Sequence, residues 1–263
     1  AHTSYRHGRL ILAANLIPLY RVDKLWTEKN LLPLFNWDHK EAKNVWEGFL
    51  WSPRIYAPLL VNIKEDFLET ARHYSQLGEH KNQYIRFLTY VALNDLDGYV
   101  LNDFINLFDK LPQEALNEAA GALVDYINAN KDQTKEYWKR NIDIFWKEVW
   151  PKSKDRMSLR IAESVAEIII LYGDDFANSF VTLKYWLKPL KFPYRILDDL
   201  VKSQICEKYP LEALDFISLI IDKEDIYSLD KLQKCLKLIA QSNSEVVNGS
   251  KYVDLLNLVN SKY

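Results

Sequence analysis

The side chains that could do acid–base or metal chemistry lie in one stretch of the chain. Glu69 and His73 are four residues apart, so on a helix they share a face, and Asp66 and His80 are nearby in sequence. Carboxylates and imidazoles can transfer protons and can bind zinc. A zinc site needs a third protein ligand, however, and His80 follows Gly78 at no recognised ligand spacing. The more ordinary interpretation of these residues is a surface or helix-capping role.

Motifs for nucleophilic or phosphate chemistry are absent from the sequence. It contains no G-x-S-x-G, G-x-x-x-x-G-K-[ST], G-x-G-x-x-G or H-E-x-x-H. We therefore expect no cofactor and no bound metal, and we interpret the chain first as a non-catalytic protein. Paired carboxylates need no motif. An enzyme that acts on a nucleotide or nucleic acid through Asp66, Glu69 and His73 therefore stays open as an alternative.

The stretch 44–60, NVWEGFLWSPRIYAPLL, combines tryptophan, tyrosine and arginine around a proline turn. These three residue types dominate the binding energy of protein interfaces, and a guanidinium can stack on a ring while it binds a carboxylate. Trp46, Trp51, Arg54 and Tyr56 are accordingly our candidate partner-binding residues. The simpler alternative is a corner between helices, at which the tryptophans fill the core.

A second stretch, 137–154, places aromatic and apolar side chains on one helical stripe and cations away from it. Its cations suggest a third hypothesis, a helical module that binds nucleic acid. They are Lys139, Arg140, Lys147, Lys152 and Lys154. Because the rings and the charges fall on different faces, the rings are better explained as core. The chain also has 34 basic and 36 acidic residues, a net charge of −2, which argues against nucleic acid as a partner.

The elements that must position these residues are helices. Apolar residues recur with helical periodicity along almost the whole chain, and two-residue alternation is nearly absent. Pro112 and Pro210 stand where helices begin, and Gly78 and Gly173 where helices end. The pattern predicts the following helices: 10–19, 42–51, 59–78, 84–92, 101–111, 114–127, 135–150, 159–172, 176–187, 194–207, 211–221, 229–239 and 252–259.

The fold class predicted is therefore all-α. Sequential hairpins of helices favour an irregular α-solenoid of the HEAT or tetratricopeptide kind, and the alternative is an irregular helical bundle. No linker rich in glycine, serine or proline divides the chain, so we expect residues 1–263 to form a single all-helical domain. The segment 150–155 is interpreted as a loop. The chain is also expected to be a fragment or module of a larger protein.

The two cysteines, Cys206 and Cys235, have no metal-binding spacing, and a chain this long with two thiols suggests a reducing compartment. No run approaches the length of about 20 apolar residues that a membrane-spanning helix needs. We therefore expect a soluble, cytoplasmic protein with buried free thiols and no membrane contact.

The stretch 44–60 also carries a resemblance to a known family. The residues Trp46, Gly48, Phe49, Leu50, Trp51, Ser52, Pro53 and Arg54 carry it. Weaker echoes lie at Tyr137-Trp138, at Phe145-Trp146 with Trp150-Pro151, and at 173–176 with Trp186-Leu187. The pattern resembles the helical C-terminal domain of unknown function of bacterial sirtuin-like anti-phage defence proteins. The resemblance covers most of residues 40–221.

The resemblance implies a non-catalytic sensor or assembly region of an anti-phage defence protein. Its implied partner is a protein, such as a phage component or other subunits of a defence assembly, and a homo-oligomer is a further option. In that family an N-terminal sirtuin-like domain would consume NAD. The present chain has no Gly-rich dinucleotide loop, so neither NAD binding nor hydrolysis is carried over.

Overall fold

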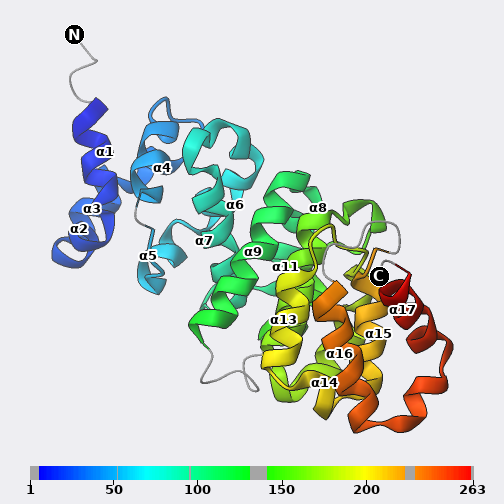
Figure 1. The fold of residues 1–263 in the computed structure, drawn as a ribbon. Helices are drawn as coiled ribbons and strands as arrows, with labels where there is room; N and C mark the ends of the chain where they lie inside the picture. Colours follow the sequence, from blue (N-terminus) through cyan, green and yellow to red (C-terminus); the bar gives the residue numbers. More distant parts are fainter. Residues whose placement is uncertain (1–5, 52, 95, 131–140, 223–228, 262–263) are drawn as a thin grey trace. The chain divides into compact units, whose positions relative to one another are not determined.

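The computed structural model describes residues 6–51, 53–94, 96–130, 141–222 and 229–261. Within these residues every regular element is a helix, and the β-type pairing consists of an isolated parallel bridge between Leu190 and Ile221 (Figure 1). The prediction of an all-α fold is confirmed. Among the described helices, none combines the length and the apolar character needed to cross a bilayer.

The chain divides into two compact units. Unit 1 comprises residues 1–122 and 144–151, and unit 2 comprises residues 123–143 and 152–263. One boundary, between Pro151 and Lys152, falls in the segment 150–155 that the sequence indicates to be a loop. The expectations of a single domain, and of a solenoid rather than a bundle, stay predictions.

Unit 1 is built from short helices. They are α1 (Arg6–Ala14), α2 (Leu16–Val22), α3 (Lys24–Asn30), η2 (Leu32–Phe35), α4 (Ala42–Leu50), α5 (Ala57–Asn62), α6 (Lys64–Glu69), η3 (Thr70–His80), α7 (Lys81–Leu93), α8 (Leu101–Lys110), the start of α9 (Gln113–Ala129) and η6 (Phe145–Val149). Their core is rich in aromatic rings. Phe67 is fully buried and meets Trp46, Tyr84 and Phe87 with ring centroids 5.5–6.3 Å apart.

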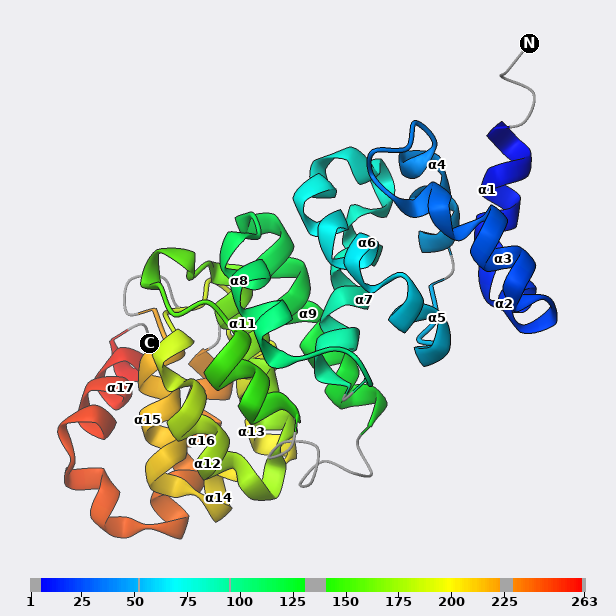
Figure 2. The same cartoon turned by 180° about the vertical axis from the view of Figure 1, so that it is seen from behind.

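The predicted helix 10–19 is divided into α1 and α2 at Asn15. A proline ring clashes with the carbonyl group four residues earlier in a continuous helix, and Pro18 would meet Ala14 in this way. Asn15 closes α1, because its side-chain amide donates to the Ile11 carbonyl at 2.9 Å. The chain thus turns, and α2 and α3 form a separate hairpin beside α1 (Figure 2).

The predicted helix 59–78 also differs from the structure, which divides it into α5, α6 and η3. The first break is at Ile63, next to Asn62, whose amide donates to Glu28 Oε1 at 2.7 Å. The second feature is Gly78, which adopts φ +56, a conformation that favours glycine. The predicted stop at Gly78 is therefore confirmed, whereas the single long helix is wrong.

Unit 2 contains the end of α9 and the helices of the C-terminal half. They are η7 (Lys154–Arg156), α11 (Leu159–Leu171), η8 (Gly173–Asp175), α12 (Phe176–Leu183), η9 (Lys184–Trp186), α13 (Tyr194–Lys202), α14 (Ile205–Lys208), α15 (Pro210–Ile220), α16 (Leu229–Ser242), η10 (Ser244–Asn248) and α17 (Ser250–Asn260). In both views α15 and α16 lie side by side (Figures 1 and 2). Phe176, Phe180 and Phe216 form an aromatic cluster in the core of this unit.

The predicted helix 194–207 is interrupted at its C-terminal end. Gln204 has φ +58, in the left-handed region, and α14 starts directly after it. The Ser203 hydroxyl donates to the Asp199 carbonyl at 2.6 Å and so closes α13. Such a side-chain bond to the backbone competes with helix continuation.

Candidate functional site

The predicted partner-binding residues lie at the end of α4, in unit 1. The helix ends at Leu50, and Trp51 follows as its C-terminal cap, with its N–H donating to the Gly48 carbonyl at 3.3 Å. Pro53 comes next, and the chain leaves the helix as an irregular segment up to Tyr56. Proline cannot continue a helix, and α4 accordingly ends before Pro53. Ser52 lies outside the described residues.

Trp46 does not belong to this surface, and the prediction that it contacts a partner is corrected. Its side chain is completely buried, and its indole N–H donates to the Phe35 carbonyl at 2.9 Å. The Phe35 ring meets it edge-on with centroids 4.8 Å apart. Trp46 therefore stabilises the core, in agreement with the alternative interpretation of a helix corner.

Trp51 and Arg54 point outward, unlike Trp46. The side chain of Trp51 is 71% exposed, and its ring lies 5.8 Å from that of His80. Arg54 is also exposed. Both residues border a pocket of about 440 Å³ between α1, α2 and the end of α4, which we name the Trp51 pocket. Its buried wall includes Leu16 and Phe49.

Arg21 completes the rim of the Trp51 pocket. Its guanidinium carbon lies 5.8 Å from the centroid of the Tyr56 ring, a cation–π distance. Tyr56 is half-buried and packs edge-on against Tyr20 at 6.2 Å. We conclude that Tyr56 does not line the pocket itself but positions Arg21, which does. Sequence reasoning missed Arg21, because it is 33 residues before Arg54 and belongs to no local pattern.

The charged side chains that line the Trp51 pocket are all positive. Its rim carries two arginines, and no Asp or Glu lines it. Neither Arg21 nor Arg54 forms an ion pair with a carboxylate of the described chain. The pocket therefore combines an apolar wall with two unpaired cations, a combination that suits an apolar side chain next to a carboxylate.

Helices α1, α2 and α3 also carry exposed apolar side chains. Val22 is 86% exposed, Leu25 78%, Ile11 60% and Trp26 43%. Contiguous exposed apolar patches usually mark a contact with another molecule, whereas apolar side chains scattered singly do not.

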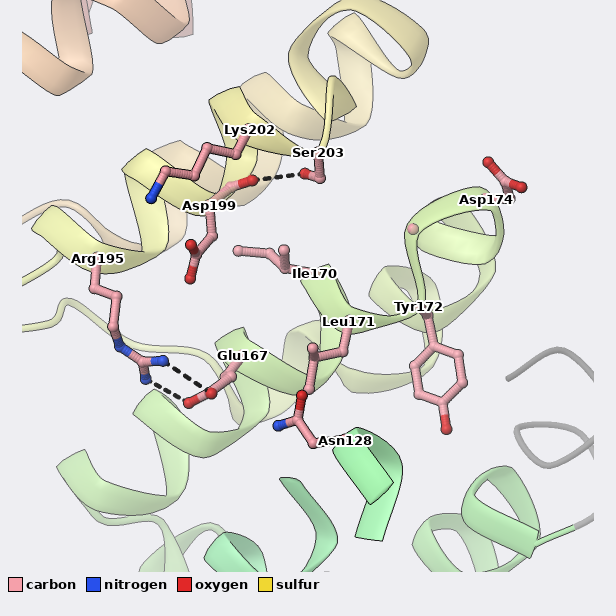
Figure 3. A pocket seen from close by; sticks show the side chains of 11 residues that line it. Asn128, Glu167, Ile170, Leu171, Tyr172, Asp174, Arg195, Asp199, Lys202 and Ser203 are labelled. Carbon is pink, nitrogen blue, oxygen red and sulfur yellow. Dashed lines mark hydrogen bonds and ion pairs between the residues drawn. The ribbon is translucent and has the colours of Figure 1, made fainter. Parts of the chain in front are cut away.

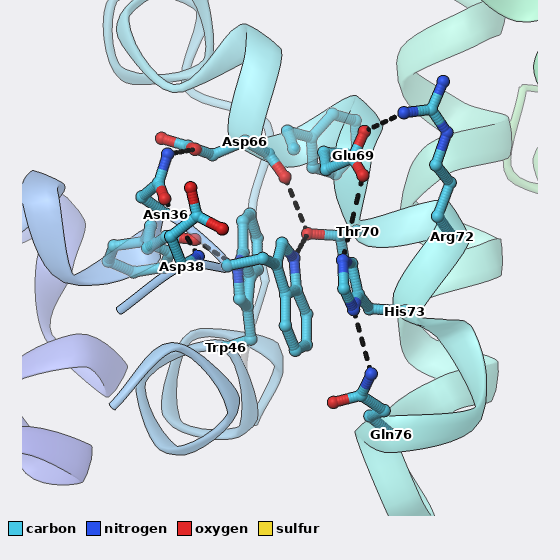
Figure 4. Close-up of polar contacts among 12 residues, drawn as sticks. Asn36, Asp38, Trp46, Asp66, Glu69, Thr70, Arg72, His73 and Gln76 are labelled. Carbon is cyan, nitrogen blue, oxygen red and sulfur yellow. Dashed lines mark hydrogen bonds and ion pairs between the residues drawn. The ribbon is translucent and has the colours of Figure 1, made fainter. Parts of the chain in front are cut away.

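The second candidate cluster, around His73, is a set of internal contacts (Figure 4). The His73 ring stacks on Trp37 with centroids 4.2 Å apart and planes 6° from parallel. Its Nδ1 shares a hydrogen bond with Gln76 at 2.9 Å. Its Nε2 is 3.8 Å from Glu69 Oε1, and the other oxygen of Glu69 accepts from Arg72 at 2.7 Å. Both ring nitrogens of His73 and both carboxylate oxygens of Glu69 thus have partners within the chain.

The remaining members of the predicted cluster do not join His73. Asp66 accepts from the Asn36 amide at 3.1 Å, and burial raises the pKa of Asp66 while this hydrogen bond lowers it. His80 lies beside Trp51 instead. Among the described residues, no three His, Cys, Asp or Glu side chains are placed to hold a metal ion. The structure thus brings together Glu69 and His73, but not the four residues.

Two of the larger pockets are lined by groups of both charges. One, of about 650 Å³ in unit 1, includes Glu69, Asp103 and Lys110, but neither Asp66 nor His73. The other, of about 610 Å³ in unit 2, is drawn in Figure 3. There Arg195 makes a two-pronged ion pair with Glu167, and Lys202 pairs with Asp198 at 2.5 Å. These cations are compensated within the chain, unlike those of the Trp51 pocket.

The cations proposed for nucleic acid from the sequence fall in different parts of the chain. Lys139 and Arg140 lie outside the described residues, Lys147 belongs to η6 in unit 1, and Lys152 and Lys154 belong to unit 2. Lys147, Lys152 and Lys154 are exposed.

Comparison of the chain with protein-family models, with curated proteins and with solved structures finds no match.

Proposed function

We propose that this chain is a non-catalytic helical interaction module that binds a protein partner at the Trp51 pocket. The observation that carries the proposal is the pairing of an exposed tryptophan with two unpaired arginines around an apolar wall. Tryptophan and arginine are the residue types most enriched among energetic anchors of interfaces. The partner segment has an apolar side chain that enters the pocket and a carboxylate that binds Arg21 or Arg54.

The biological setting that we propose follows the resemblance of residues 44–54. The module is the sensor or assembly region of a bacterial anti-phage defence protein in the cytoplasm, and its partner is a phage protein or another subunit of the assembly. The two free, buried cysteines support a reducing compartment. The exposed apolar side chains of α1–α3 support a further protein contact in unit 1.

Selection from a displayed library of short random peptides tests the pocket without knowledge of the partner. We expect the wild-type chain to enrich sequences with Asp or Glu next to Leu, Ile, Phe or Trp. The double variant R21A/R54A and the variant W51A lose this enrichment. The double variant K29A/K40A removes two exposed cations from elsewhere in unit 1 and serves as the matched control. Enrichment that is absent, or equal in W51A and wild type, would exclude this binding site.

Capture from bacterial lysates then tests the biological setting. Wild-type chain and the double variant R54A/Y56A are used as bait in phage-infected and uninfected lysates, with mass spectrometry as the readout. We expect a phage protein that is captured after infection by the wild type and not by the variant, whose helical content is unchanged. Capture of the chain's own copies alone would support self-assembly instead.

The enzyme alternative has a separate measurement. Metal analysis of the purified chain, together with hydrolysis assays on nucleotides and nucleic acid, examines the site at Asp66, Glu69 and His73. Activity that is lost in His73→Ala would replace the present proposal. The contacts of His73 with Trp37, Glu69 and Gln76 favour a structural role for this residue.

A further inference from the structure

A different surface, in unit 2, stands out by its chemistry. The segment 184–195, KYWLKPLKFPYR, contains four cations, four aromatic residues and no Asp or Glu. It comprises η9, the connection that follows, and the first residues of α13. Nothing in the Trp51 pocket proposal uses these residues, which belong to the other unit.

The segment is held in place by several side chains that enter the core. Trp186 is 5% exposed, Leu190 is 1% exposed, and Pro193 is also buried. The backbone N–H of Leu190 donates to the carbonyl of Ile220 at 2.8 Å, at the end of α15. The connection is therefore a fixed platform.

The remaining aromatic side chains of the segment are presented to solvent. Tyr185 is 57% exposed, Phe192 63% and Tyr194 50%. Covering an exposed aromatic ring with a ligand removes apolar area from water and is therefore favourable. Three such rings lie within ten residues on an anchored backbone, and we name this set the Tyr185–Tyr194 platform.

Cations accompany each of these rings. Lys154 Nζ lies 4.3 Å from the Tyr185 centroid, Lys191 Nζ lies 5.5 Å from that of Phe192, and Lys231 Nζ lies 5.1 Å from that of Tyr194. The aromatic groups and the charges are thus interleaved here. In the stretch 137–154, by contrast, the sequence pattern separates them.

The platform has a net positive charge. Lys231 is compensated by Asp198 at 2.6 Å, and Arg195 by Glu167. No carboxylate of the described chain pairs with the four remaining lysines, which are Lys154, Lys184, Lys188 and Lys191. Lys154 and Lys191 lie over two of the exposed rings, and Lys184 and Lys188 belong to the same segment. Uncompensated cations next to exposed rings suit a ligand with repeated negative charge and flat, stackable groups.

We propose that the Tyr185–Tyr194 platform binds single-stranded nucleic acid. Bases stack on Tyr185, Phe192 and Tyr194, and the lysines contact the phosphates between them. A duplex hides its bases and fits less well. An anionic membrane is a poorer match, since Leu187, Leu190 and Trp186 are buried and leave no exposed aliphatic group in the segment to enter lipid. This activity is additional to peptide binding at the Trp51 pocket.

Fluorescence anisotropy with labelled oligo(dT) and oligo(rU) of about 20 nucleotides, in roughly 50 mM salt, tests the proposal. We expect binding by the wild type, with each of F192A and Y185A weakening it about 5- to 100-fold through lost stacking. K188Q/K191Q lowers the slope of log K against log salt by about 0.7 for each lysine removed. All of these residues are on the surface, and circular dichroism checks that the helices persist.

Matched controls separate this platform from general charge effects. K234Q/K237Q removes two exposed cations from α16, a helix without aromatic residues, and should leave the binding constant within about twofold of wild type. W51A removes an exposed ring from unit 1 and should bind oligonucleotide as wild type does. Conversely, F192A should retain peptide binding at the Trp51 pocket, so that failure of one proposal is distinguishable from failure of the other.

Three results would overturn the proposal. The first is an absence of oligonucleotide binding by the wild type at low salt. The second is equal affinity of F192A, Y185A and the wild type, or equal affinity for a duplex of the same length. The third is sedimentation with phosphatidylserine vesicles in place of oligonucleotide binding, which would assign the platform to a membrane surface.

Discussion

Gly48 of α4 faces the backbone carbonyl of Leu10 in α1 so closely that a Cβ atom on residue 48 would overlap this oxygen. The Cβ of Ala13 would also be only 3.0 Å away. Since both obstacles belong to the first helix, Gly48 sets the distance between α1 and α4. That distance in turn shapes the Trp51 pocket, which these helices and α2 line.

Gly48→Ala is therefore expected to destabilise unit 1, by about 1–3 kcal/mol, as overpacked core positions do. Gly121 provides the matched control, because it lies within α9 and nothing within 4 Å would meet its Cβ. Gly121→Ala should stabilise the helix by about 0.5–1 kcal/mol. Urea unfolding measures both. A Gly48→Ala protein as stable as wild type would show that α1 does not pack on α4 at this distance.

Trp46 of α4 and Trp51, the cap of this helix, are expected to behave oppositely on substitution. Trp46→Ala removes a fully buried ring and its hydrogen bond to Phe35, and should cost about 3–5 kcal/mol of unfolding free energy. Trp51→Ala removes a ring that is 71% exposed and should change stability by no more than about 0.5 kcal/mol. Thermal unfolding followed by circular dichroism distinguishes them. Equal losses in both variants would contradict the exposure of Trp51.

Helical periodicity by itself places these two tryptophans on different faces of the helix. Trp46 lies three and four residues before Phe49 and Leu50, on one face of α4, whereas Trp51 is rotated from Trp46 by about 140°. The residues that carry the family resemblance are largely packing residues for the same reason, because Trp46, Gly48 and Phe49 are buried. Arg21 cannot be assigned to the pocket in this way, because it lies on another helix and no local sequence pattern links it to α4.

The helices themselves are largely predictable from the sequence, because apolar spacing and Pro or Gly punctuation act locally. The predictions are wrong where a single residue interrupts an apolar pattern. Pro18 is visible in the sequence and explains the break at Asn15, whereas the left-handed Gln204 has no signature in its residue type. The composition of 184–195 is also visible, but only the burial of Trp186 and Leu190 shows which rings face solvent.

His73 is expected to contribute to stability through its stack on Trp37. His73→Ala should lower the unfolding free energy by about 0.5–1.5 kcal/mol, and His73→Phe, which keeps a flat ring, should recover most of this loss. Arg72→Ala breaks only an exposed ion pair with Glu69 and should cost at most about 1 kcal/mol. Guanidinium titration of the three variants provides the values. If His73→Phe is no better than His73→Ala, the imidazole nitrogens matter more than the stack.

Asp198 links two helices of unit 2 and should make stability depend on pH in the acid range. Hydrogen bonds from Lys202 and Lys231 lower the pKa of Asp198 to about 2. Because the folded-state pKa is below its usual value, the stabilisation is present above about pH 4 and is lost as the pH falls through about 2. The urea midpoint of wild type should thus approach that of Asp198→Asn as the pH decreases from about 5 to 2.

Asp97→Asn is the control for this pH dependence, since Asp97 is exposed and makes no ion pair with the described chain. Its urea midpoint should differ from that of wild type by the same amount throughout the range. A difference between wild type and Asp198→Asn that does not shrink on acidification would mean that Lys202 and Lys231 do not hold the Asp198 carboxylate in solution.

The two cysteines are expected to be chemically silent in the folded protein. Cys206 of α14 and Cys235 of α16 are both fully buried and free. A hydrogen bond with Cys206, followed by burial, raises the pKa of Cys235, whose thiol also lies 3.5 Å from the Leu197 carbonyl. Since the thiolate is the reactive form, Ellman's reagent at about pH 8 should modify neither cysteine in the native state. Both should react at once in strong guanidinium.

Rapid reaction of one thiol in the native protein would mean that α14 and α16 separate readily, because the reagent reaches these sulfur atoms only through an opening of their interface.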